Sequence, residues 1–521
     1  MSSEPPPLEL WGGLECSLNR VGSSFRDQTA LSGHDVRPDD IDRFAALGFR
    51  ALRYPVLWER TETAPGRFDW SWADARLSAI RNAGMRVVAG LVHHGSGPAW
   101  TDLLDPGFAH GLARFAGEAA HRYPWVRDWT PVNEPLTTAR FSALYGLWHP
   151  HKADPLSFWT ALLNQIDGVR LSMQAIRQSI PQARLIQTED FGHVFATPPC
   201  EDQADYENRR RFMTWDLLCG RVTPAHPLHQ ELADLGLAGR LAEIAAAPCP
   251  PVIGLNHYLT SDRFLDHRLD RYPAALHGGN GQMAYADVEA VRVVVPPLQG
   301  WAWHLSCLWS RYQLPIVVTE CHLGCTREEQ LRWLNECWTA AAAARDAGAQ
   351  IEAVTVWNLL GGYDWNSLLT RNEGVYESGV FDLSEGDPRP TALAALVRDL
   401  AKDGSAAMSL AREAGWWRRP QRLLFPAHPL TEAAEPRPCE PSSHAVYCLS
   451  EEMTSDLILE CERRGLRLAS SDSEQSAAPW TYSPSSVPTA RAMDLMIDEC
   501  FLGRPPVPAT GHRETGGLRR I

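Results

Sequence analysis

The sequence lacks the long apolar runs and the positive charge that membrane-spanning and nucleic-acid-binding proteins carry. No stretch of about 18 consecutive apolar residues occurs, so we expect no contact with a membrane. The chain has 49 Lys and Arg against 63 Asp and Glu, a net charge of -14, which argues against a nucleic-acid partner. The first residues, MSSEPPPLEL, contain neither a basic nor an apolar segment, so we expect no secretory signal and a cytoplasmic location. A small-molecule substrate fits this composition best.

Paired cysteine motifs and nucleotide-binding glycine motifs are also missing. None of the 12 cysteines forms a C-x-x-C pair of the kind that marks zinc or redox sites. The closest two, Cys321 and Cys325, have no second pair, so we expect reduced thiols and no bound metal. Residues after 402 contain no G-x-G-x-x-G and no P-loop. The sequence therefore predicts neither a metal nor a cofactor.

Between residues 8 and 402, short apolar runs rich in β-branched residues alternate with longer amphipathic stretches. This alternation is typical of repeated βα units and a parallel sheet. Eight such units close naturally into an α/β fold of the (β/α)₈ TIM barrel type, so we expect residues 1–402 to form one barrel. The expected strands are LELWGG (8–13), FRALRY (49–54), MRVVAGLV (85–92), VRDWTPV (126–132), ARLIQTE (183–189), PVIGLNH (251–257), LPIVVTE (314–320) and IEAVTVWN (351–358).

Residues 403–521 have a different composition. They are rich in Pro, Ser, Glu and Arg, as in FPAHPLTEAAEPRPCEPSSH (425–444). Such a segment buries too little apolar surface to offset the entropy of ordering the chain. The composition predicts a largely disordered C-terminal tail with one or two short helices, for which 451–465 is the best candidate.

In a (β/α)₈ barrel the chemistry gathers at the C-terminal ends of the strands. The expected strands end in, or are followed closely by, a series of polar and aromatic residues. These are Arg53, His93, Asn133, Glu134, Glu189, Asn256, Tyr258, Glu320, Trp357 and Asn358.

Two of these residues, Glu134 in TPVNEP and Glu320 in VVTECHLG, form a candidate catalytic pair. Hydrolysis of a glycosidic bond with retention needs two carboxyl groups about 5 Å apart, one protonated and one ionised. A single glutamate after a strand is usually a surface or ion-pair residue. Two glutamates that each end a buried apolar strand are much harder to interpret as surface or ion-pair residues.

These two segments resemble the T-[FL]-N-E-P and I-T-E-N-G motifs of glycoside hydrolase family 1, and they occur in the same order. The resemblance implies a β-glucosidase-like retaining glycosidase that acts on a small glycoside. Glu134 would then be the general acid/base and Glu320 the nucleophile that forms a glycosyl-enzyme intermediate. Asn133 would hold the sugar 2-hydroxyl.

Other segments between residues 8 and 402 resemble further motifs of the same family. LWGGLECSLNR, ALRYPVLWER, VVAGLVHH, IGLNHYLTS and VWNLLGGYDWNS are the matching stretches. The resemblance implies that Arg53 favours the anion of Glu320 and that Tyr258 orients it. It implies that the remaining matched residues contact the sugar: Asn19, His93, Trp357, Asp364 and Trp365.

Each of these residues, taken alone, also has a structural reading. Trp357 and Tyr258 could be core aromatics, His93 a satisfied buried histidine, and Arg53 an ion-pair partner. Their joint placement at successive strand ends, in the order of one family, is what favours a binding site.

The sequence departs from the family pattern at four places: Asn19 stands for Gln, Asp364 for Glu, His94 for Trp, and Cys321-His322 for Asn-Gly. Asn19 and Asp364 are each one methylene shorter than the family residue, and a lost buried hydrogen bond costs about 1–3 kcal/mol. A second hypothesis is therefore a catalytically weak barrel that binds a sugar or a sugar nucleotide, in dTDP-rhamnose or related nucleotide-sugar metabolism.

The chain also resembles the N-terminal part of bacterial fusions that end in a dTDP-4-dehydrorhamnose reductase-like domain, with AGWWRRPQRLLF (414–425) at the junction. Because the tail lacks the glycine fingerprint, no reductase activity is expected. A third hypothesis, a scaffold partner of such a reductase, rests on this resemblance alone. The oligomeric state stays open.

Overall fold

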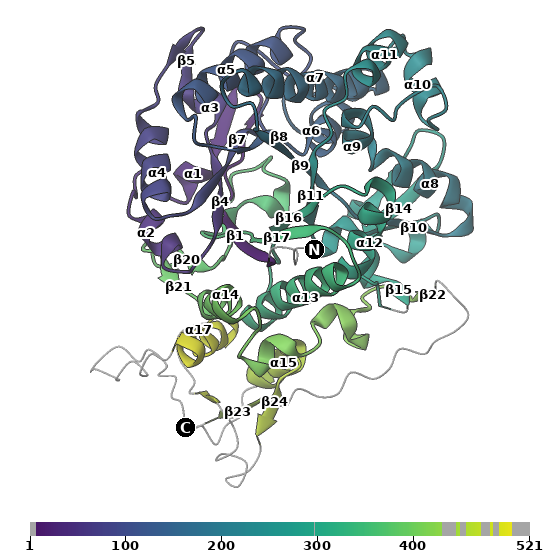
Figure 1. Ribbon diagram of the computed structural model, residues 1–521. Helices are drawn as coiled ribbons and strands as arrows, with labels where there is room; N and C mark the ends of the chain where they lie inside the picture. The colour runs from purple at the N-terminus through teal and green to yellow at the C-terminus, as the bar shows by residue number, and fades with distance from the viewer. Residues whose placement is uncertain are drawn as a thin grey trace.

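The computed structural model describes residues 7–295, 297–429, 444–448, 455–469, 480–482 and 489–502 (Figure 1). Its centre is a closed barrel of eight parallel strands, hydrogen-bonded in the order β1-β17-β16-β11-β9-β8-β7-β4. Each strand overlaps one of the eight predicted runs, so the predicted (β/α)₈ barrel is confirmed. The strands are β1 (Glu9–Gly13), β4 (Ala51–Pro55), β7 (Arg86–His93), β8 (Asp128–Asn133), β9 (Arg184–Asp190), β11 (Val252–His257), β16 (Ile316–Cys321) and β17 (Ile351–Val356).

Helices cover the outside of the barrel and begin and end at the expected signals. Helix α7 has Asp154 as its N-cap, which accepts a hydrogen bond from Ser157 N at 2.8 Å, and Pro155 at its first position. Helix α14 ends at Gly404, whose φ of 66° suits a C-cap. The main helices are α2 (Asp40–Ala45), α4 (Ser71–Asn82), α5 (Phe108–Arg122), α7 (Pro155–Ser179), α9 (Met213–Leu218), α12 (Trp301–Tyr312), α13 (Arg327–Asp346) and α14 (Ala392–Asp403). In the described residues, no helix combines the length and the apolar character needed to cross a membrane.

The barrel interior is filled by side chains and is not a channel. Seven strands each contribute one residue to a buried apolar cluster inside the barrel, as packed TIM barrels do. The cluster consists of Trp11, Ala51, Val88, Ile186, Val252, Val317 and Ala353.

Short elements that the strand pattern did not predict lie between the barrel strands. A hairpin of β2 (Leu18–Val21) and β3 (Ser24–Asp27) follows β1. A four-stranded sheet in the order β10-β12-β14-β13 lies beside the barrel (Figure 1). Its strands are β10 (Val194–Ala196), β12 (Arg263–Asp266), β13 (His277–Gly279) and β14 (Ala284–Glu289).

The described parts of the C-terminal segment pack on the barrel helices. In Figure 1, helix α17 (Thr489–Leu502) lies against α14, and α15 (Ser455–Arg464) lies below α13. Strands β23 (Ala445–Cys448), β24 (Arg467–Ala469) and β25 (Trp480–Tyr482) form a small parallel sheet. Helix α15 lies within the predicted helix 451–465. The low order of the rest of the tail and the division of the chain at residue 402 stay predictions.

Buried ion pairs fasten this segment to the barrel. Arg464 of α15 lies 3.0 Å from Glu328 of α13, and both side chains are fully buried. Asp498 of α17 lies 2.8 Å from Arg327 and accepts a hydrogen bond from Ala392 N, at the start of α14. Loss of one partner from a buried pair leaves the other charge uncompensated, which is strongly destabilising.

We therefore expect Asp498→Ala to lower the free energy of unfolding by about 3–5 kcal/mol. The measurement is chemical denaturation followed by tryptophan fluorescence. Glu385→Ala is the control, because Glu385 is 70% exposed and lies 4.0 Å from its partner Arg491; it should change the stability by less than about 0.5 kcal/mol. Equal effects of the two substitutions would contradict a role for the buried pair.

Candidate active site

Glu134 stands at a sharp turn at the end of β8. Its φ is 47°, in the left-handed region, and helix α6 (Pro135–Ala139) begins at the next residue. A non-glycine residue in this conformation costs about 1–3 kcal/mol, and such strain clusters at functional sites. The Glu134 side chain is buried, and its Oε1 accepts a hydrogen bond from Asn256 Nδ2 of strand β11. The turn thus holds a carboxyl group at the C-terminal end of the barrel.

Glu320, near the end of β16, has a donor on each carboxylate oxygen. Arg53 Nη1, on β4, donates to Oε1 at 2.6 Å. The Tyr258 hydroxyl, which follows β11, donates to Oε2. Both hydrogen bonds stabilise the ionised carboxylate, because charge-assisted bonds are stronger than neutral ones.

Arg53 and Asn256 link the two carboxyl groups into one network. Arg53 Nη2 also donates to Oδ1 of Asn133, the residue before Glu134. Asn256, which binds Glu134, pairs in register with Glu320 on the neighbouring strand. The barrel therefore brings two glutamates that are remote in sequence to the same end of one sheet.

The surroundings of the two carboxyl groups differ in charge. Burial raises the pKa of Glu134 well above its usual value, and the negative charges of Glu320, Asp190 and Glu189 raise it further. Burial also raises the pKa of Glu320, but there Arg53 and Tyr258 act in the opposite direction. These surroundings favour the protonated form of Glu134 and the anionic form of Glu320.

His93 and Trp357 form an aromatic wall beside Arg53. Their rings stack with centroids 5.7 Å apart at an angle of 7°, and the Arg53 Cζ lies 4.9 Å from the Trp357 ring centroid. Asn133 Nδ2 lies 3.2 Å from His93 Nε2, and His93 Nδ1 lies 3.3 Å from Cys16 Sγ. Burial lowers the pKa of His93 well below its usual value, so the ring is neutral.

His94, which stands where the family pattern has Trp, contacts the other side of Glu134. Its Nε2 lies 3.7 Å from Glu134 Oε2, and its ring centroid lies 5.6 Å from that of Trp365. Burial lowers the pKa of His94 to about 3, so it is a neutral, polar neighbour of the acid.

Through these contacts eight of the ten predicted site residues form one connected group: Glu134, Glu320, Arg53, Asn133, Tyr258, His93, Trp357 and Trp365. Asn19 and Asp364 make no hydrogen bond with the other eight in the described structure. Asn19, on β2, is fully buried, and neither of its side-chain amide atoms has a partner there. Such an amide is costly unless a ligand or water bonds it.

Asp364 is used in its own loop. It has a φ of 59°, and its Oδ1 accepts hydrogen bonds from Glu373 N at 3.1 Å and Val375 N at 3.0 Å. Only its buried Oδ2 has no partner among the described residues. The loop backbone therefore occupies one of the two carboxylate oxygens of Asp364, and only the other is available to a sugar.

Glu189, noted in the sequence only as a strand-end residue, supports the turn that carries Glu134. Its carboxyl oxygens accept from Leu136 N at 2.8 Å and Thr137 N at 3.1 Å, in the first turn of α6. Burial raises its pKa to about 7. The sequence showed its position at the end of β9 but not these partners, which lie on another βα unit.

Glu15 is a further buried carboxyl group that sequence reasoning did not single out. It follows β1, burial raises its pKa to about 7, and the charge of Glu320 adds to that shift. The available signal was a charged residue in the apolar segment WGGLECS, directly after the first strand.

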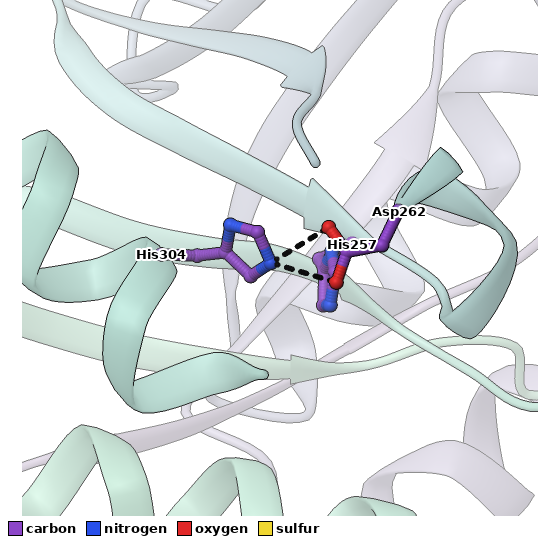
Figure 2. Close-up of side chains that lie close together, drawn as sticks. All are labelled: His257, Asp262 and His304. Carbon is purple, nitrogen blue, oxygen red and sulfur yellow. Dashed lines mark hydrogen bonds and ion pairs between the residues drawn. The ribbon is translucent and has the colours of Figure 1, made fainter. Parts of the chain in front are cut away.

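At the end of β11, His257 forms a separate buried cluster with Asp262 and His304 (Figure 2). Their potential metal-ligating atoms lie within 4.8 Å of one another. Asp262 Oδ1 lies 3.2 Å from His304 Nε2 and accepts from His193 N at 2.7 Å. The contacts with His304 and with His193 N therefore satisfy the Asp262 carboxylate within the protein. Burial lowers the pKa of His257 to about 3, and the positive charge of nearby Arg211, which contributes to that shift, would also oppose a cation.

Comparisons with known proteins relate the chain to glycosidases at low identity. No protein-family model matches it. It is 20% identical over 422 residues to a phospho-cellobiase of Klebsiella oxytoca, covering 68% of this chain and 87% of that protein. It is 20% identical over 386 residues to a 6-phospho-β-glucosidase of Dickeya chrysanthemi, covering 68% of this chain and 81% of that protein.

Solved structures show the same fold. A family 1 β-glucosidase from Thermotoga maritima is 15% identical with a TM-score of 0.60, over 77% of this chain and 99% of that structure. The β-glucosidase from Thermotoga maritima in complex with cyclophellitol gives a TM-score of 0.62 at 15% identity, with the same coverage. The chain therefore has the fold of family 1 β-glucosidases, while the predicted relation to reductase fusions stays a prediction.

Proposed function

We propose that the chain is a retaining β-glycosidase, with Glu134 as acid/base and Glu320 as nucleophile. The observation that carries this proposal is the asymmetric pair: two buried carboxyl groups at one end of the barrel, one beside Arg53 and Tyr258 and the other beside further carboxylates. A retaining glycosidase needs one carboxylic acid and one carboxylate facing the same bond. Sequence similarity to glycosidases supports the same reaction class.

The reaction proceeds in two displacements. Glu134 donates its proton to the glycosidic oxygen while a Glu320 oxygen attacks the anomeric carbon, so that the bond to the aglycone breaks and the aglycone leaves as an alcohol. Glu134, now ionised, then takes a proton from water, which attacks the anomeric carbon and releases Glu320. Arg53 and Tyr258 bind Glu320 as the anion in which it starts and ends the cycle.

The remaining site residues are assigned to the sugar. The unpaired amide of Asn19, the indole N–H of Trp365 and the His93–Trp357 wall offer hydrogen bonds and an apolar face to a β-glucoside-like substrate. Because the two curated relatives are named for phosphorylated glucosides or cellobiose, the substrates to be tested include both neutral and 6-phosphorylated aryl β-glucosides. We also propose a cytoplasmic location, since Cys16, Cys321 and Cys337, among the described residues, form no disulfide.

A second candidate function, a barrel that binds a sugar or sugar nucleotide without efficient hydrolysis, draws support from Asp364. Its engagement with the 373–375 backbone leaves one carboxylate oxygen for a ligand. Calorimetric sugar binding without hydrolysis of any glycoside in a broad panel would favour this candidate over the glycosidase.

The two glutamates should give opposite stereochemistry when azide rescues their alanine variants. In Glu320→Ala, azide takes the place of the nucleophile, so turnover of a nitrophenyl β-glycoside should yield the α-glycosyl azide. In Glu134→Ala, the glycosyl-enzyme still forms with this good leaving group, and azide attacks from the opposite face to give the β-glycosyl azide. Product NMR distinguishes the two anomers, and the reverse pairing would exchange the proposed roles.

Tyr258→Phe should move the acidic limb of the pH profile of kcat/KM to higher pH. The Tyr258 hydrogen bond lowers the pKa of Glu320, so its loss raises that pKa, and the required anion is lost at a higher pH as the medium becomes acidic. The alkaline limb, which reports the proton on Glu134, should stay in place. Tyr312→Phe is the matched control, because the Tyr312 hydroxyl donates to Asp216 at 3.0 Å outside the site. An unchanged acidic limb in Tyr258→Phe would contradict the assignment.

A further inference from the structure

Glu15 places an additional carboxyl group among the substrate-binding residues. Its side chain is 5% exposed and comes from the C-terminal end of β1. One oxygen, Oε1, accepts a hydrogen bond from Ser17 N at 2.8 Å, and the Glu15 amide donates to Asn358 Oδ1 at 3.1 Å. Asn358 directly follows Trp357, so the bond from the Glu15 amide places Glu15 next to the aromatic wall.

The Glu15 side chain adjoins Trp365, and its carboxyl group is close enough to Glu320 to respond to its charge. Burial raises the pKa of Glu15 to about 7, the charge of Glu320 adds to this shift, and the adjacent Trp365 indole acts in the opposite direction. A Cβ built on Gly362 would lie 3.6 Å from Glu15 Cγ and 3.3 Å from Trp365 Cδ1, which puts these two side chains on the same small residue. The Trp365 indole nitrogen is itself buried and makes no hydrogen bond to the described residues.

Glu15 and Asp364 each use one carboxylate oxygen to accept hydrogen bonds from nearby backbone amides, but in the described structure only Glu15 adjoins an indole N–H. One carboxylate oxygen of Asp364 accepts hydrogen bonds from two loop amides. One carboxylate oxygen of Glu15 accepts a hydrogen bond from the Ser17 amide. The carboxyl group adjoins the Trp365 indole N–H, which has no partner in the described structure. A hydroxyl group held between a carboxylate and an indole N–H would satisfy both, as buried polar groups require.

The charges of the site oppose an anionic ligand. Of the four acidic side chains Glu15, Glu134, Glu320 and Asp364, Glu134 carries the catalytic proton, which leaves up to three anions, and Arg53 is the one cation among the ten predicted site residues and Glu15. The Arg53 guanidinium is already bonded to Glu320 and Asn133. Repulsion between like charges is strong in a buried site, because water screens it poorly.

We propose that Glu15 is a specificity-determining residue of the sugar pocket, which accepts a hydrogen bond from a glycone hydroxyl and excludes glycones that carry a phosphate. The substrate class is then a glycoside with a neutral glycone. This inference rests on the proposed function for its substrate, but its binding part can be tested without catalysis.

The first experiment measures binding, at about pH 8, where a carboxyl with a pKa near 7 is ionised. Calorimetry with D-glucose and with glucose 6-phosphate should show at least about 10-fold tighter binding of the neutral sugar, the effect of one unfavourable charged contact. Glu15→Gln keeps the size of the side chain and one acceptor oxygen but removes the charge. The ratio of the Kd of glucose 6-phosphate to the Kd of D-glucose should therefore fall about 10-fold, mainly because glucose 6-phosphate binds more tightly.

Glu59→Gln is the matched control. Glu59 is likewise buried with a pKa raised to about 7, but its Oε1 accepts from Gly97 N and none of its charged neighbours is a predicted site residue. The preference should stay unchanged in this variant. A preference for glucose 6-phosphate in the wild-type protein, a ratio that Glu15→Gln leaves unchanged, or no binding of either sugar would overturn the inference.

The second experiment measures kcat and KM for nitrophenyl β-glucoside and its monodeoxy analogues. Glu15→Ala should lower kcat/KM for the parent by about 10- to 100-fold, the loss of one hydrogen bond to a charged group. The same substitution should cost little on the analogue that lacks the bound hydroxyl. Equal losses on every analogue would contradict hydroxyl binding. Absence of hydrolysis together with the expected binding ratio would refute the glycosidase alone and leave the role of Glu15 intact.

Discussion

The barrel mouth depends on one buried cation, the guanidinium of Arg53. It donates to Glu320, to the Thr319 carbonyl and to Asn133, and its face lies on Trp357. Without it, a buried carboxylate at position 320 would have no compensating charge, and burial would drive it to the protonated form. A planar fork of donors suits these divergent partners, whereas a lysine would offer a single point charge. The arginine therefore determines which glutamate is the anion.

Strained backbone and rigid strands hold this arrangement. Glu134, His94 and Asp364 all have positive φ values, and all three stand where a strand or loop turns into the site. Such conformations persist only when the surroundings fix them, and here Glu189 fixes the first turn of α6. Side chains mounted on strand ends and braced in this way lose little freedom when a substrate binds, which is the condition for precise positioning of acid and nucleophile.

The eight strands and most of the candidate site could be predicted from the sequence, because a barrel strand is a buried apolar run and a polar residue at its end has few reasons to be there. What could not be predicted depends on contacts between distant segments. Asp364 matches a sugar-binding position in sequence, yet its orientation follows from a left-handed φ and two loop amides. The polar composition after residue 402 predicts little buried structure. Arg464 and Asp498 are nevertheless buried, because they pair with Glu328 and Arg327 of α13.

The central claim is that Glu320 and Glu134 act on one sugar from opposite sides. Its most direct test is inactivation with a 2-deoxy-2-fluoro-β-glycoside that carries a good leaving group, followed by digestion and peptide mass mapping. A fluorosugar accumulates on the nucleophile because the fluorine slows both displacements and the leaving group restores only the first. The account predicts a single ester on Glu320; an ester on Glu134, Glu15 or any other residue would contradict it.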